Sequence, residues 1–244
     1  EVITELEADD LVMISNDEGN IKALNLNQKF QDIIRACPEA GYAKKVIVCE
    51  GKTEIGICRA LDTYRKKSDK ECMSFKDCVY ILGEGSSFTE RAMKLKKLGL
   101  SVCIFCDSDD DSNLKPSKDE LKKAGVEIFD RDASKAIEQQ VFQDLPWDGI
   151  KKLINYVIKE KNIYEDQLKQ SIKSKYEGKF PDDFKNSDTP EMRQAIGEAS
   201  KKAEWFKRIN QGEKLGSIIF DYFKEMNDKK IKNQLESLSN WIDE

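Results

Sequence analysis

The sequence contains no histidine among its 244 residues. This absence excludes Ser-His and Cys-His nucleophilic catalysis, zinc sites that use imidazole, and histidine general bases. Any chemistry must therefore use carboxylates, lysine, or a metal ion held by oxygen ligands.

Long apolar segments are also missing. No apolar run approaches the roughly 18 residues that span a bilayer, and the acidic opening of the chain, residues 1–10, lacks the basic and apolar regions of a signal peptide. With 39% hydrophobic and 36% charged residues, the composition is typical of a soluble globular protein. We therefore expect a cytoplasmic protein with no membrane partner. The net charge of −5 argues against wrapping of nucleic acid over the whole surface, but it is compatible with a local basic channel.

Seven cysteines, an odd number, argue against a framework of disulfides. Most of them lie within apolar runs, as Cys49 does, so reduced thiols are expected. Cys103 and Cys106 have the spacing of a CxxC motif, but inside a strand their side chains would point to opposite faces of the sheet. A zinc site at this pair is therefore not expected.

Residues 44–133 alternate between short apolar runs and amphipathic segments. The predicted strands are 45–49, 78–82, 100–106 and 126–129, and the predicted helices between them are 53–65, 89–98 and 117–124. Near-continuous apolar strands separated by amphipathic helices predict a parallel sheet that is covered on both faces. The expected fold class is therefore α/β.

Two further segments flank this α/β unit. Apolar runs at 11–14 and 21–24 enclose a strong turn signal, which predicts an N-terminal β-hairpin, and a helix is expected around 28–37. Residues 134–244 are rich in lysine and glutamate with helical spacing, and a polar, proline-bounded stretch at 180–190 interrupts them. The expected parts are a hairpin and helix segment (1–43), the α/β core (44–140) and a helical extension (141–244).

Acidic residues follow two of the predicted strands. Glu50 comes directly after strand 45–49, and Asp107 and Asp109 follow strand 100–106. In an open parallel sheet, ligands bind beyond the carboxyl ends of the strands, so these acids should meet at one edge. Clustered carboxylates repel one another unless divalent cations neutralise them, and such hard oxygen ligands select Mg²⁺, Mn²⁺ or Ca²⁺ over zinc. An aspartate run alone is more often a solvated turn than a metal site, so the joint placement after these strands carries the prediction.

Other ligand motifs fit the spacing poorly. Counted from Asp107, the sixth position of an EF-hand loop would be Ser112 instead of glycine. Residues 51–53, Gly-Lys-Thr, resemble the end of a P-loop, but Val46 stands where that motif needs its first glycine. The glycine pair in 83–87 fits a tight turn between strand and helix as well as it fits a phosphate loop.

Two segments resemble the motifs of a known domain family. Residues 46–51, Val-Ile-Val-Cys-Glu-Gly, resemble the first TOPRIM motif, a strand that ends in Glu and then Gly. Residues 104–109, Ile-Phe-Cys-Asp-Ser-Asp, resemble the second, the DxD motif. The form Glu-Gly-Lys-Thr-Glu, with Glu54 as its second glutamate, is similar to the OLD (overcoming lysogenization defect) family. Proteins of that family join an N-terminal ABC-type ATPase to a C-terminal TOPRIM nuclease.

The resemblance implies further functional residues. Glu138 follows the fourth strand, where OLD-type nucleases carry another acidic metal ligand, although Ala136 stands where a second acid is expected. Lys214 lies where these nucleases place a lysine near the scissile phosphate. The opening residues 2–6 and the hairpin resemble the end of the ATPase domain, so 1–43 is expected to be its tail. A homo-oligomer formed through that domain is also expected.

By this resemblance the chain has a TOPRIM-type fold and is a metal-dependent DNA endonuclease that nicks or cleaves its substrate. In-line attack of water would use two Mg²⁺ or Mn²⁺ ions about 4 Å apart, with Ca²⁺ as a non-productive substitute. Asp107 is expected to bridge the ions, and Lys214 is expected to balance charge at the phosphorus. The expected metal ligands are Glu50, Glu54, Asp107, Asp109 and Glu138, and the expected catalytic residues are Glu50, Asp107, Asp109 and Lys214.

Two other functions stay open at this point. A TOPRIM domain of primase or topoisomerase type is one alternative, but a topoisomerase needs a nucleophilic tyrosine. The candidates Tyr156, Tyr164, Tyr176 and Tyr222 lie in no recognisable motif. The second alternative is a non-catalytic scaffold for assembly whose acids hold no metal. Covalent attachment of cleaved DNA would indicate a topoisomerase, and absence of specific Mg²⁺ or Mn²⁺ binding would indicate a scaffold.

Overall fold

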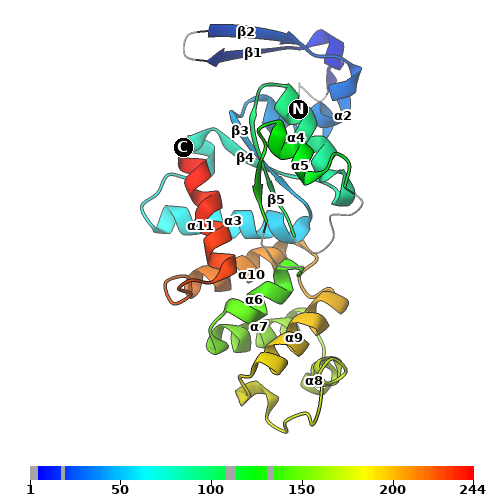
Figure 1. Ribbon diagram of the computed structural model, residues 1–244, viewed down its shortest axis with the longest axis vertical. Coiled ribbons are helices and arrows are strands. Elements are labelled where there is room, and N and C mark those ends of the chain that lie inside the picture. Colours follow the sequence, from blue (N-terminus) through cyan, green and yellow to red (C-terminus); the bar gives the residue numbers. More distant parts are fainter. Residues whose placement is uncertain (1–4, 18–19, 108–113, 131–134) are drawn as a thin grey trace.

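A four-stranded parallel sheet lies at the centre of the protein, as the computed structural model in Figure 1 shows. The structure describes residues 5–17, 20–107, 114–130 and 135–244. The strand order is β4-β3-β5-β6, with β3 at Lys45–Cys49, β4 at Cys78–Leu82, β5 at Ser101–Phe105 and β6 at Glu127–Phe129. All neighbouring strands are parallel. The predicted α/β class, with a parallel sheet flanked by helices, is confirmed.

The two faces of the sheet border separate apolar cores because successive side chains of a strand point to opposite faces. Val46 and Val48 of β3 lie in one core, and Ile47 and Cys49 lie in the other. The first core includes side chains of α2 (Gln31–Ala36), α4 (Phe88–Lys97) and α5 (Lys118–Lys123). The second includes side chains of α3 (Lys52–Lys67) and α11 (Lys230–Asp243). The central strands are therefore buried on both sides, which explains their continuous apolar sequence.

The cysteines follow this division between the cores. All seven are buried free thiols. Cys103 lies in the core on the α3 side and Cys106 in the core on the α4 side, so the prediction that they point to opposite faces is confirmed. The Sγ atoms of Cys49 and Cys58 lie 3.7 Å apart in the α3-side core.

Helices α6 (Ile137–Asp144), α7 (Trp147–Glu160), α8 (Glu165–Lys173) and α9 (Pro190–Lys202) lie at the end of the molecule opposite the N-terminal hairpin (Figure 1). Helix α10 (Ile209–Asp221) packs against both α7 and α3. Helix α9 begins at Pro190 because the Thr189 hydroxyl accepts a hydrogen bond from the Met192 N–H and proline suits the first helical position. The α3-side core continues from the sheet into these helices without a break. The extension therefore packs directly on the α/β core.

Helices α3 and α10 approach each other at the level of their backbones. A Cβ atom on Gly56 would lie 2.3 Å from the Glu213 nitrogen, and one on Gly212 would lie 2.5 Å from the Thr53 carbonyl oxygen. Any larger side chain at either glycine would push the helices apart. This contact holds the start of α10, and the connection before it, against the N-terminal turn of α3.

The N-terminal segment forms a two-stranded antiparallel sheet of β1 (Val12–Asp17) and β2 (Asn20–Asn25). Val12, Ile14 and Ile21 are 55%, 70% and 75% exposed. Leu26 and Ile33, which follow the hairpin, join the core on the α4 side of the central sheet. Among the described residues, no helix is long and apolar enough to cross a bilayer.

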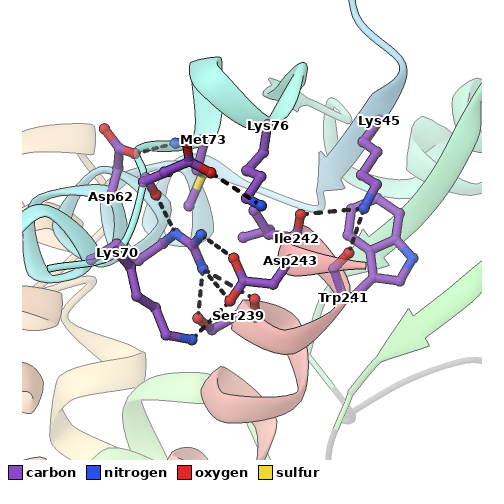
Figure 2. A network of polar contacts seen from close by, with 11 residues as sticks. Lys45, Asp62, Lys70, Met73, Lys76, Ser239, Trp241, Ile242 and Asp243 are labelled. Atoms are coloured by element: carbon purple, nitrogen blue, oxygen red, sulfur yellow. Dashed lines mark hydrogen bonds and ion pairs between the residues drawn. The ribbon is translucent and has the colours of Figure 1, made fainter. Parts of the chain in front are cut away.

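The C-terminal helix is fastened to the α/β core by the polar network in Figure 2. The fully buried Arg65 guanidinium donates to the Asp243 carboxylate and to the Ser239 hydroxyl, the latter at 2.8 Å. The Lys45 ammonium donates to the carbonyls of Trp241 and Ile242 at 3.0 and 3.2 Å. These contacts satisfy carbonyls near the end of α11 and neutralise a charge that burial would otherwise penalise.

Asp243→Asn should destabilise the fold, because it leaves the buried Arg65 charge without its carboxylate. We expect a loss of about 1–3 kcal/mol, as for a buried donor that loses its partner. Hydrogen bonds from Arg65 and Lys70 lower the Asp243 pKa to about 2. Because this folded-state pKa lies below the unfolded value, the stabilisation is present above about pH 4 and is lost as the pH falls toward 2.

Urea titrations between pH 2 and 7 measure this effect. The difference in free energy of unfolding between native protein and Asp243→Asn should shrink as the pH falls from about 4 toward 2. Lys70→Ala is the matched control, since it removes an exposed partner of the same carboxylate and should cost little. A constant difference in stability from pH 7 to pH 2 would contradict the assigned role of Asp243.

Candidate metal centre

The loops after β3 and β5 bring Glu50 and Asp107 together. The Glu50 N–H donates to the Phe105 carbonyl at 3.1 Å, which extends the pairing of β3 and β5 by one residue. The Glu50 Oε2 atom accepts a hydrogen bond from the Asp107 N–H at 2.9 Å. The Glu50 carbonyl accepts from the Gly85 N–H at 3.1 Å, so the loop after β4 lies at the same edge. The prediction that these loops converge is therefore confirmed for Glu50 and Asp107.

Glu54 lies in the first turn of α3 and is only 4% exposed. Its Oε2 atom accepts a hydrogen bond from the N–H of Gly51, the N-cap residue that follows Glu50, at 2.9 Å, so it caps α3. The motif Glu-Gly-Lys-Thr-Glu thus places two glutamates on either side of a tight strand-to-helix turn. Their spacing is set by this cap.

Glu138 enters the site from the first turn of α6, where it is 2% exposed. The Asp107 Oδ1 atom accepts a hydrogen bond from the N–H of Ile137, the first residue of α6, at 2.7 Å. The amino terminus of this helix therefore faces Asp107 and interacts favourably with a carboxylate. Ala136 is the N-cap of α6, so the position where a second acid was expected holds no carboxylate.

These carboxylates interact electrostatically as one group, hereafter the carboxylate cluster (Glu50, Glu54, Asp107 and Glu138). Burial raises the Glu54 pKa well above its ordinary value, and the negative charges of Asp107, Glu138 and Glu50 raise it further. The two most buried members, Glu54 and Glu138, come from different helices, and the other two follow adjacent strands. The fold thus concentrates negative charge where water is scarce, an arrangement that a cation would stabilise.

Among the described residues, Lys207 is a basic side chain that interacts electrostatically with the cluster, and no sequence motif indicated it. Lys207 lies in the connection between α9 and α10. Partial burial lowers its pKa, but Glu138, Glu54 and Asp107 raise it by more, so the net shift is upward. The connection is held in place by the Thr53 hydroxyl, which donates to the Phe206 carbonyl at 2.9 Å. Lys207 therefore stays charged beside the carboxylates.

A second lysine that the sequence did not indicate supports the loop of Asp107. The Lys118 side chain is largely buried, and its Nζ atom donates to the Asp107 carbonyl at 3.3 Å and to the Asp130 carboxylate at 2.9 Å. It thereby links the ends of β5 and β6. Since it contacts the Asp107 backbone, we interpret it as a positioning residue.

The remaining predicted residues lie elsewhere or cannot be placed. Asp109 falls outside the described residues. Lys214 lies on α10 with an exposed side chain, and its catalytic role stays a prediction. Within the segment 83–87, Gly85–Ser87 form a short 3-10 turn before α4, which agrees with the interpretation as a tight turn.

The donor chemistry of the cluster fits a hard divalent cation, because all of its ligand atoms are carboxylate oxygens. Among the described residues, however, no three Asp, Glu or Cys side chains converge closely enough to hold a metal ion. Carboxylate oxygens of Glu50, Glu54 and Asp107 instead accept backbone N–H groups. Coordination of one ion by these residues would therefore require their side chains to change position.

Glu54→Gln tests the electrostatic cost of the cluster. Because the folded-state pKa of Glu54 lies above the ordinary value of 4.5, metal-free protein should lose stability as the pH rises above about 4.5. The neutral glutamine removes this loss of stability, so the metal-free variant should melt several degrees higher than native protein at pH 7. A stability difference of 1 kcal/mol corresponds to roughly 2–4 °C at this chain length.

Addition of Mn²⁺ should reverse the order of the two melting temperatures, so that native protein melts above Glu54→Gln. A bound ion stabilises the folded state by mass action, so the melting temperature of native protein should rise, and that of Glu54→Gln should rise less. Thermal melts with and without Mn²⁺ measure both effects, with the exposed Glu177→Gln as control. Equal gains in the native protein and Glu54→Gln would show that the ion binds elsewhere.

Comparison with known proteins gives a distant likeness in structure. No protein-family model and no curated protein matches the sequence. The C-terminal region of the Xanthomonas campestris pv. campestris OLD protein has a similar structure, with 13% sequence identity and a TM-score of 0.48. The match covers 84% of this chain and 96% of that one. This likeness is too distant to support an argument about function.

Proposed function

We propose that the protein is a divalent-metal-dependent phosphodiesterase that cleaves DNA. The observation that carries this proposal is the carboxylate cluster with Lys207 beside it. Clustered carboxylates at the carboxyl ends of parallel strands are suited to Mg²⁺ or Mn²⁺, and a lysine next to them is suited to an anionic substrate. A phosphodiester that bridges the metal and the lysine would use both features.

The cluster would hold the metal through Glu50, Glu54, Asp107 and Glu138, together with Asp109 from the DxD motif. When bound, divalent ions supply positive charge that activates a water nucleophile and stabilises the leaving oxygen. Lys207 would contact a non-bridging phosphate oxygen, where a point charge is adequate. The amino terminus of α6 would hold the Asp107 carboxylate in position, and Lys118 would hold its loop.

Basic residues around Lys207 suit an extended polyanion. Lys201, Lys202, Lys207 and Arg208 are all exposed, and they lie at the end of α9 and in the connection to α10. Because Lys207 borders the cluster, a phosphate backbone bound along this stretch would pass over the carboxylates. The negative charge of the whole chain does not oppose this, since the contact is local.

The sequence resemblance supports a more specific proposal about the domain type and the protein family. We propose a TOPRIM-type domain that acts as the nuclease part of an OLD-family protein, joined to an ABC-type ATPase and assembled as a homo-oligomer through it. The motifs at 46–51 and 104–109 support this assignment. The ATPase is tested by whether the complete gene encodes a P-loop domain before Glu1.

Plasmid cleavage tests the proposed function. Native protein should nick or linearise supercoiled DNA in Mg²⁺ or Mn²⁺, and excess EDTA should stop the reaction. Cleaved DNA should migrate free of protein after denaturation without protease, whereas a topoisomerase would stay covalently attached. Specific Mn²⁺ binding by calorimetry, combined with no cleavage of DNA or RNA, would favour a metal-binding scaffold and contradict the proposal.

A further inference from the structure

The outer edge of β4 forms the floor of a groove of about 500 Å³. Strand β4 is an end strand of the central sheet and is hydrogen-bonded to β3 on one side. Glu39 borders the groove from the segment after α2, and Asp62 and Ser74 border it from the α3 side. The volume lies within the range of pockets that take small ligands or short peptides. This groove is separate from the carboxylate cluster, which lies beyond the carboxyl ends of the strands.

Alternate residues of β4 direct their backbone groups into the groove. The Gly83 N–H donates to β3 at 2.6 Å, and the Asp77 carbonyl accepts from β3 at 3.0 Å. The odd-numbered residues of this segment therefore direct their backbone groups toward β3. Even-numbered residues point the other way, so Tyr80 directs its N–H and C=O away from β3 and into the groove. The Leu82 carbonyl has the same outward direction and accepts a hydrogen bond from Arg91 at 2.6 Å.

Apart from Arg91 at the Leu82 carbonyl, strand β4 has few of the features that usually protect a sheet edge. Edge strands are typically short, charged, proline-containing or covered. The sequence of β4, Cys-Val-Tyr-Ile-Leu, contains no charge and no proline. At the opposite edge, β6 is three residues long and begins with the exposed Glu127, and both α5 and α11 pack against it. An unprotected apolar edge with outward N–H and C=O groups is suited to pairing with another strand.

The α3-side wall of the groove is fixed by contacts that Figure 2 shows. The Asp62 Oδ1 atom accepts from the Met73 N–H at 2.7 Å, and Arg65 donates to the Glu71 carbonyl at 3.1 Å. Lys76 pairs with the Glu71 carboxylate at 3.1 Å. The 3-10 turn Met73–Lys76 is thus tied to α3, which keeps the groove open beside β4.

The charges at the groove favour a cationic occupant. Its lining holds three carboxylates, from Glu39, Asp62 and Glu84, and one guanidinium, from Arg91. Arg91 is already engaged by Glu84 at 2.9 Å, and Lys66 pairs with Asp62 at 2.8 Å from outside the lining. The exposed Glu39 is the carboxylate best placed for a new partner. A second copy of this chain is disfavoured as occupant, because two strands recessed between walls cannot meet and their acids would repel.

The geometry points to a docking site for an extended peptide segment of a partner protein that carries lysine or arginine. The peptide adds a fifth strand to the sheet along β4 and exchanges hydrogen bonds with the backbone of Tyr80. A basic side chain of the peptide pairs with Glu39. This inference does not depend on the proposed nuclease activity.

Selection from a phage-displayed library of random heptapeptides on the full chain tests the site. We expect enriched peptides with alternating apolar residues and at least one Lys or Arg. Tyr80→Pro removes the outward N–H without touching the pairing to β3, and it should weaken binding about tenfold, the effect of about 1.4 kcal/mol. Tyr80→Val keeps the N–H and is the matched control. Glu39→Lys should weaken binding of the basic peptides through charge repulsion.

A second arm does not depend on protein variants. N-methylation of alternate amides in an enriched peptide blocks strand pairing on one edge, so one of the two methylation patterns should lose at least tenfold in affinity. Equal binding of both patterns, enrichment of acidic peptides, or no enrichment would overturn the site. A dimer in sedimentation velocity that Tyr80→Pro abolishes would also overturn it, in favour of a second copy on β4.

Discussion

Asp107→Asn should reduce metal-dependent DNA cleavage by more than about 10²–10³-fold, the loss that follows removal of a single electrostatic group. The loss should exceed that range because a carboxylate that holds the metal supports water activation and leaving-group stabilisation together. The asparagine Oδ1 atom can still accept the Ile137 N–H, which Asp107 binds at 2.7 Å, so α6 should keep its position. The variant thus separates the charge of Asp107 from its structural contact.

Plasmid cleavage in Mn²⁺ and calorimetric titration of Mn²⁺ measure the two consequences. Asp182→Asn, at an exposed position in the loop before α9, is the matched control and should behave as native protein. A variant that binds Mn²⁺ more weakly and no longer cleaves would support the centre. Undiminished cleavage by Asp107→Asn would exclude Asp107 from it.

The sequence predicted the central sheet closely because its strands are buried on both faces. A run such as Lys45–Cys49 is apolar at nearly every position, which is typical of a strand between two helical layers. Once the sheet is parallel, the carboxyl ends of its strands share one edge, so Glu50 and Asp107 were expected as neighbours. The hydrogen bond between them bears this out.

Lys207 could not be predicted because nothing local determines its position. It lies between two helices, outside any periodic pattern or motif. Its place beside the carboxylates depends on the Thr53–Phe206 hydrogen bond, which spans 153 residues, and on the glycine contacts between α3 and α10. Such contacts are tertiary and leave no signal in a single sequence. The resemblance selected Lys214 instead, which lies farther along the chain on α10.

The groove beside β4 was missed for a related reason. The sequence marks Cys78–Leu82 as a buried strand, but it does not tell which strands end the sheet. Strand order depends on how the connecting helices pack, and β4 lies at the edge because β3 pairs with β5 on its other side. Edge status, and the open backbone that follows from it, is therefore a property of topology.

Lys207→Ala should slow DNA cleavage about 10²–10³-fold, because it removes a preorganised positive charge beside the reacting phosphate. Metal affinity should stay equal or rise slightly, since Lys207 repels a cation held by Glu54, Asp107 and Glu138. Lys207→Arg keeps the charge and should recover part of the rate. Lys214→Ala tests the lysine that the family resemblance indicates.

Single-turnover cleavage at saturating enzyme distinguishes these roles from general DNA binding. Lys201→Ala and Lys202→Ala serve as controls, because a residue that only contacts the phosphate backbone weakens binding in a salt-dependent way and loses its effect at saturation. If Lys207→Ala cleaves slowly at saturating enzyme while Lys214→Ala cleaves at nearly the native rate, the positive charge that acts on the phosphate lies in the α9–α10 connection. The reverse result would assign it to α10 and leave Lys207 as a residue that only balances the charge of the carboxylates. If neither variant is slower than the controls at saturation, no lysine acts on the phosphate, and the metal centre alone must stabilise the transition state.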